Sequence, residues 1–326
     1  TSEGEFDLSF LNSELIGNKI DIYNISKVEH NYNSIDLYTN DGSVIHLLNN
    51  NSTIVINDAN GNLKGGYKID SNGNLSNIDI YGSYNNANNQ FGGSQRAIRY
   101  NIDSLLDDSL IYEELENSWP GSSYWEKSDY LYGMSTAACG YVGEINGLFK
   151  QYEGREEEFR NTFGIDMYKI DSEGNVDFNY EYMIIKFYDY ANRAEYSNIS
   201  NVYHEGFTAE RSKDFEKFLS EEYGINVTSK NYNAYDSASN EVTYYYSSNE
   251  IVDAYNNLVN DGYESIMIAS DNYQLLDYDT GAVSRSYQYD YHAMSVIGVE
   301  NNHLIVSSWG NKYILDLDYN DYSNFY

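Results

Sequence analysis

The chain has 326 residues, and its 51 acidic against 19 basic side chains give a formal net charge of −32. Phosphate backbones and anionic lipid headgroups repel such a chain, so the composition argues against nucleic-acid binding and membrane attachment. Hydrophobic residues make up only 41%, but the 16% of aromatic residues, including 37 tyrosines, offers enough burial area for a folded chain.

The segment from residue 17 to about residue 82 consists of short β-branched and aromatic runs separated by turn residues. Turns such as Asn60-Gly61-Asn62 tolerate the positive φ angles of tight hairpins. The pattern predicts a six-stranded antiparallel meander with almost no helix. Its strands are expected over residues 19–25, 34–38, 44–48, 53–56, 66–69 and 78–81.

Residues 83–96 are polar and aperiodic, as is typical of a domain boundary. We therefore predict a β-rich domain over residues 1–95 and a second domain over residues 96–326. Helical spacing of apolar residues begins after this boundary, and Pro120 ends the first such segment. Helices are expected over residues 104–119, 139–151, 156–163, 209–223 and 249–260, and strands over residues 264–270, 291–299, 304–309 and 312–317. Helices followed by an antiparallel sheet describe an α+β domain.

Cys139 is the only cysteine, so the chain forms no intramolecular disulfide and has no thiolate cluster for structural zinc. No histidines pair at metal-ligand spacing, and we expect neither a metal nor another cofactor. The apolar stripe after Cys139 predicts a helix buried along one side, with Cys139 in its first turn and Ser135 or Thr136 as caps. A thiol at a helix N-terminus lies near the positive end of the helix dipole, which favours the reactive thiolate. The alternative is a small buried apolar residue.

The segment that begins at His292 resembles the histidine hairpin of papain-like cysteine peptidases. In that family a strand begins His-Ala and reaches a Gly, and the return strand ends in Asn-Ser-Trp-Gly before a Tyr-Ile strand. The matching residues here are His292-Ala293, Gly298, Ser308-Trp309-Gly310 and Tyr313-Ile314. The Cys139 helix is similar to the nucleophile helix of the bacteriocin-processing branch of that superfamily.

The resemblance implies a papain-like domain over residues 96–326 that cleaves peptide or related amide bonds, with Cys139 as nucleophile and His292 as acid and base. The family's His-orienting Asn corresponds to Ser307, and its oxyanion Gln corresponds to Gly133. The backbone N–H of Cys139 would remain as an oxyanion donor, with Ser135 as its partner and Trp309 as support for the site. Loss of one oxyanion donor typically costs roughly two to three orders of magnitude in kcat.

These two departures leave an alternative, in which the same scaffold has lost catalysis and serves as a surface binding or adhesion module. The expected partner is a peptide or protein substrate, basic or neutral in preference to acidic because of the net charge. The sequence predicts neither nucleic-acid binding nor membrane insertion, and it leaves the oligomeric state open. The protein is expected to be either cytosolic or secreted with its signal segment removed, and composition favours the second, a bacterial extracellular or cell-surface protein. The β-rich domain is expected to be an inhibitory propeptide or a recognition domain.

Overall fold

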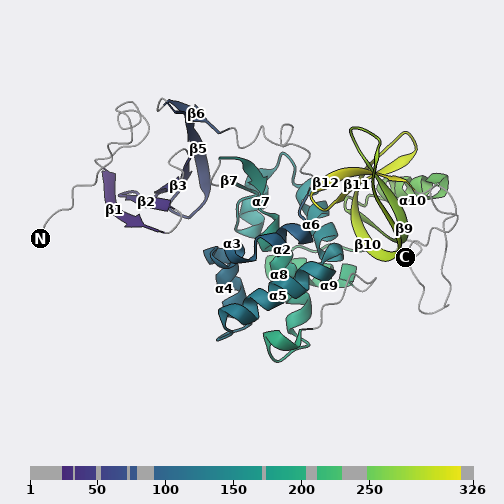
Figure 1. Cartoon of the computed structure of the whole chain (residues 1–326), viewed down its shortest axis with the longest axis horizontal. Coiled ribbons are helices and arrows are strands. Elements are labelled where there is room, and N and C mark those ends of the chain that lie inside the picture. The colour runs from purple at the N-terminus through teal and green to yellow at the C-terminus, as the bar shows by residue number, and fades with distance from the viewer. Residues whose placement is uncertain are drawn as a thin grey trace, which may run out of the picture. The chain divides into compact units, whose positions relative to one another are not determined.

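The computed structural model describes residues 24–31, 34–48, 53–71, 74–78, 92–170, 174–202, 211–229 and 248–316 (Figure 1). Within these ranges the chain combines helices with three antiparallel sheets, which confirms the α+β class. Two compact units emerge, Thr1–Ala87 with Phe159–Asn179, and Asn88–Glu158 with Tyr180–Tyr326. No helix among the described residues combines the length and the apolar character that crossing a membrane requires.

The first unit contains the predicted six-stranded meander, in which each strand pairs with the next along the chain. The strands are β1 (Ile25–His30), β2 (Ser34–Thr39), β3 (Val44–Leu48), β4 (Thr53–Asn57), β5 (Leu63–Ile69) and β6 (Leu75–Asn77). Alternating inward residues form its core, namely Leu37, Ile45, Leu47 and Ile54.

The first and last strands of the meander differ from the prediction. Strand β1 lies later than residues 19–25 because the backbone N–H of Asn31 donates to the Ser34 carbonyl and closes the hairpin there. Strand β6 lies earlier than residues 78–81 because Asp70 accepts the backbone N–H of Asn74 at 2.8 Å, so the return strand starts at once. Residues 19–23 and 79–81 lie outside the described residues.

A second hairpin, β7 (Tyr168–Ile170) with β8 (Val176–Phe178), also belongs to the first unit. This differs from the predicted division at residues 95 and 96, which assigned the hairpin to the second domain. Asp166 explains the placement, because its carboxylate accepts the backbone N–H of Leu63 in β5 and the Nε of Arg160, each at 2.5 Å. Residues 83–91, most of the predicted boundary, lie outside the described residues.

The second unit holds most of the helices. They are α2 (Gln95–Tyr100), α3 (Ile102–Leu106), α4 (Ser109–Ser118), α5 (Tyr124–Ala137), α6 (Cys139–Gln151), α8 (Tyr180–Arg193), the 3-10 turn η3 (Ile199–Asn201), α9 (Arg211–Tyr223) and α10 (Ser248–Asn260), while α7 (Glu156–Phe163) crosses between the units. The helix predicted over residues 104–119 is two helices, because Asp108 accepts the N–H groups of Leu110 and Ile111 and caps α4.

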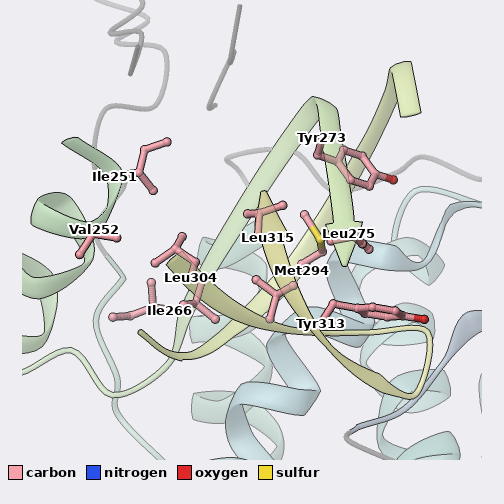
Figure 2. Close-up of a cluster of buried hydrophobic side chains, with 11 residues drawn as sticks. Ile251, Val252, Ile266, Tyr273, Leu275, Met294, Leu304, Tyr313 and Leu315 are labelled. Atoms are coloured by element: carbon pink, nitrogen blue, oxygen red, sulfur yellow. The ribbon is translucent and has the colours of Figure 1, made fainter. Parts of the chain in front are cut away.

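The strands of the second unit are β9 (Ile266–Asp277), β10 (Val283–Glu300), β11 (His303–Ser308) and β12 (Asn311–Asp316). They close into a barrel in the order β10-β11-β12-β9. Figure 2 shows side chains from these strands and from α10 converging on one apolar core. This core includes Ile251, Val252, Tyr273, Leu275, Met294, Leu304, Val306, Tyr313 and Leu315.

Helix α6 packs closely against β9 and β10 through small residues one turn apart. A Cβ atom on Gly143 would lie 2.4 Å from the sulfur of Met267, and one on Gly147 would lie 1.9 Å from the Ser265 hydroxyl oxygen. Every residue from Cys139 to Phe149 is buried. The predicted one-sided burial is therefore wrong, because α8 and α9 cover the helix on its other sides.

We expect Gly147→Val to lower the free energy of unfolding by roughly 1–3 kcal/mol, because its methyl groups would overpack the contact between α6 and Ser265, the residue before β9. Urea denaturation measures the change. Gly298→Val is the matched control, because a Cβ on that strand glycine meets no atom within 4 Å. Equal stability losses in the two variants would contradict the close contact.

Candidate active site

Cys139 is the first residue of α6, and the residue is 8% exposed. It forms a small buried cluster with Ala269 of β9 and Ala293 of β10, which are partners in the strand register. Ala293 directly follows His292 in β10. The fold thus brings Cys139 to the strand that carries His292, although the two residues lie far apart in the sequence.

The helix that precedes Cys139 changes the predicted environment of its thiol. Ala138 alone separates α5 from α6 and makes no side-chain cap. The predicted caps are wrong, because the Ser135 hydroxyl donates to the Tyr132 carbonyl at 2.6 Å and the Thr136 hydroxyl to the Gly133 carbonyl at 2.7 Å, both inside α5. The C-terminal end of α5 therefore adjoins the N-terminus of α6, so the dipole at Cys139 is weaker than that of an isolated helix.

His292 is buried and held by Ser308, the last residue of β11, and by Trp309 in the turn to β12. Its ring stacks on the Trp309 indole with centroids 4.2 Å apart and planes 4° apart. Its Nε2 atom lies 2.7 Å from the Ser308 hydroxyl oxygen. Trp309 and Gly310 have φ angles of 47° and 78°, and this tight reversal positions the indole against the imidazole.

Ser307 does not orient His292, so that prediction is corrected to Ser308. The Ser307 hydroxyl accepts a hydrogen bond from the Nδ2 of Asn146 in α6 at 3.3 Å. The Oδ1 of the same Asn146 accepts the backbone N–H of Gly93 at 2.7 Å. Adjacent strand residues face opposite sides of a sheet, so Ser307 points toward α6 while Ser308 points toward His292.

The same alternation separates the thiol from the imidazole. Ala293 faces Cys139, so His292 faces the other side of β10, where Tyr273 lies with its ring centroid 5.9 Å from that of the imidazole. Among the described residues, the hydrogen bond of the His292 ring goes to Ser308 and not to the Cys139 thiol. Cys139 and His292 are therefore close along the strand but are not a preformed hydrogen-bonded pair.

Burial lowers the pKa of His292 to about 3, and the positive charges of Arg96 and Arg285 contribute to the shift. The imidazole is therefore neutral near pH 7. A neutral imidazole can accept a proton as a general base, but it cannot provide the imidazolium of a preformed ion pair with a thiolate.

Two polar residues on α6, Asn146 and Glu144, were not predicted from the sequence as part of the site. Asn146 links α6 to Ser307 and to Gly93. Its position two turns after Cys139, on the same face of the helix, was the sequence feature that could have predicted its place near the site. Glu144 is buried against α9, where its carboxylate accepts the Ser212 hydroxyl at 3.2 Å. Burial raises the pKa of Glu144 to about 7, although the Ser212 hydrogen bond opposes the shift.

The described residues contain no group of three or more His, Cys, Asp or Glu side chains that could hold a metal ion. The site is thus a cysteine and a histidine on neighbouring elements, with Ser308, Trp309 and two arginines around the histidine. No protein-family model, curated protein or solved structure matches this chain.

Proposed function

We propose that the second unit is a papain-like thiol hydrolase that cleaves peptide or related amide bonds. The observation that carries the proposal is the packing of Cys139 against Ala293, the residue after His292. The stacking of Trp309 on His292 supports the proposal as well. It places the His-Ala and Ser-Trp-Gly motifs, which carry the sequence resemblance, next to each other.

In this proposal the neutral His292 ring removes the proton from the Cys139 thiol as the sulfur attacks the substrate carbonyl. The resulting imidazolium then protonates the leaving amine, and a thioester to Cys139 remains. Water, activated by the same ring, hydrolyses the thioester and regenerates the thiol. Because His292 faces the other side of β10 in the unliganded protein, the proposal requires its side chain to leave Ser308 and reach the Cys139 side of the strand once substrate is bound.

The proposed enzyme has a weak oxyanion hole. The backbone N–H of Cys139 is its proposed donor, whereas the Ser135 hydroxyl is engaged with the Tyr132 carbonyl. Because one missing donor typically costs roughly two to three orders of magnitude in kcat, we expect a slow hydrolase. The Trp309 ring would shield the imidazole from water during the reaction.

Alkylation of the only cysteine tests the proposal. We expect iodoacetamide to add one carbamidomethyl group to the folded protein near neutral pH, and His292→Gln to slow this reaction, because the imidazole assists deprotonation of the thiol. Intact mass spectrometry measures both rates. A thiol that reacts only after urea unfolding would exclude the hydrolase.

An unreactive thiol would favour the second candidate, a catalytically silent scaffold that acts as a surface binding or adhesion module. The burial of His292 and its hydrogen bond to Ser308 favour this candidate. Burial keeps the ring neutral, and the hydrogen bond holds its Nε2 atom on Ser308. For either function we propose a bacterial extracellular or cell-surface location. The first unit would then serve as a propeptide or as a recognition domain.

A further inference from the structure

One acidic side chain of the second unit is buried at a contact between two helices. Glu144, on α6, is 7% exposed, and its carboxylate accepts the hydroxyl of Ser212, in the first turn of α9, at 3.2 Å. Within the described part of the chain, no basic side chain lies within ion-pair distance of Glu144. A carboxylate without a counter-charge is costly to bury, so this contact is sensitive to the charge of Glu144.

The charged groups on the elements that pack against α6 do not compensate for this burial. On α8, Lys186 pairs with Glu222 at 3.4 Å, and Asp189 accepts the indole N–H of Trp119 at 2.5 Å. Burial raises the pKa of Glu144 to about 7, the Ser212 hydrogen bond opposes the shift, and no neighbouring charge contributes to it. The other charged or titratable side chains described on these elements include Glu181 and Arg193 on α8, Lys213, Asp214, Glu216, Lys217 and Glu221 on α9, Asp277 on β9, Arg285, His292 and Glu300 on β10, and His303 on β11.

The two ends of α9 are held by different chemistry. Near its C-terminal end, Glu222 pairs with Lys186 at 3.4 Å and with Arg193 at 3.5 Å, both on α8. In its first turn, Ser212 makes the hydrogen bond to Glu144 on α6. Docking of the N-terminal turn of α9 therefore depends on a buried acid, whereas docking of the other end uses ion pairs.

Ser212 can serve both protonation states of Glu144. A hydroxyl accepts a hydrogen bond from a protonated carboxyl group and donates one to an ionised carboxylate. The ionised form loses far more hydration on burial, and a single hydroxyl replaces only part of the water that it would bind. Water reaches this carboxylate once the first turn of α9 moves away from α6. Ionisation thus favours the open turn, and protonation favours the closed one.

We infer that Glu144 and Ser212 form a pH-dependent latch, which holds the N-terminal turn of α9 on α6 while Glu144 is protonated and releases it when Glu144 ionises. The latch is separate from the proposed catalysis, because Cys139 contacts β9 and β10 whereas Glu144 contacts α9. It makes the cover over the helix that begins at Cys139 tighter in acid than at neutral pH.

The direction of the pH effect follows from the two states of Glu144. Its pKa is about 7 in the closed form, and a water-exposed glutamate in the open form has an ordinary pKa of about 4.3. Between these values the closed form holds a proton that the open form has released. Closure is therefore strongest below about pH 4.3, and it weakens as the pH rises toward 7.

Hydrogen–deuterium exchange of the full chain at pH 5 and pH 8, corrected for intrinsic exchange rates and followed by mass spectrometry, tests the latch. In the wild type, the opening constant for residues 211–216 should rise by roughly 10- to 100-fold between the two pH values. Glu144→Gln keeps the shape of the side chain but cannot ionise, so its opening constant should be the same at both.

Glu221→Gln is the matched control, because Glu221 lies on the same helix but accepts the Tyr190 hydroxyl at 2.6 Å. It should keep the wild-type pH dependence. Ser212→Ala removes the hydrogen bond that lowers the pKa of Glu144, so its transition should move to higher pH. Circular dichroism confirms that the variants are folded. An unchanged opening constant in the wild type, a rise that survives Glu144→Gln, or an unshifted transition in Ser212→Ala would overturn the inference.

Discussion

Replacing Cys139 by alanine is expected to reduce the proposed peptide hydrolysis by at least about four orders of magnitude, because the reaction would lose its proposed nucleophile. The fold should tolerate the change, since an alanine methyl group fits between Ala269 and Ala293 with the loss of one buried sulfur atom. Initial rates on a mixture of fluorogenic peptides measure the effect, and thermal unfolding verifies that the variant is folded.

Thr136→Ala is the matched control for this prediction. Thr136 lies one turn earlier, and its hydroxyl donates to the Gly133 carbonyl within α5, so its loss should leave the rate nearly unchanged. Full activity in Cys139→Ala together with its loss in Ser308→Ala would assign the nucleophile to the hydroxyl that lies 2.7 Å from His292. That outcome would reject the thiol mechanism while keeping the histidine as the base.

His292 should make the protein less stable in acid by a measurable amount. Its ordinary pKa of about 6.5 applies to the unfolded chain, whereas burial and the two arginines lower it to about 3 in the folded protein. Between these values the unfolded chain binds a proton that the folded protein does not. The contribution to stability is therefore complete above pH 6.5 and is lost as the pH falls toward 3.

The measurement is the difference in unfolding free energy between the wild type and His292→Gln. From pH 7 to pH 4.5, this difference should shift against the wild type by roughly 2–3 kcal/mol. Glu144, with its pKa of about 7, titrates in both proteins and cancels from the comparison. His303→Gln, at an exposed hairpin turn, is the matched control. A difference that is independent of pH would show that His292 has the same pKa in the folded and the unfolded protein.

Local chemistry made part of the fold predictable. The apolar spacing after Cys139 gives the bounds of α6 as residues 139–151, in agreement with the structure. The Asn-Gly turns likewise predict the order of the meander. Helices α5 and α8 were missed because polar residues and tyrosines interrupt their apolar pattern, although the Ser123 and Glu126 capping box marked the start of α5.

The sequence suggested members for the candidate site but not the directions of their side chains. Cys139, His292 and Trp309 follow from the resemblance, and the structure places all three in the second unit. The exchange of Ser307 for Ser308 depends on strand register, since a shift of one residue reverses the side on which a side chain lies. Strand β10 carries such an irregularity between Val296 and Gly298, where it pairs with β11. No local pattern reveals that shift.

The single residue between α5 and α6 has a consequence for the rigidity of Cys139, the proposed nucleophile. Ala138 replaces a loop, and α6 is buried along its length, so folding alone fixes the backbone of Cys139. Substrate binding would then spend no conformational entropy on ordering the nucleophile. Any adjustment between the reacting groups must come from the histidine side, where Trp309 and Ser308 hold the ring in its resting position.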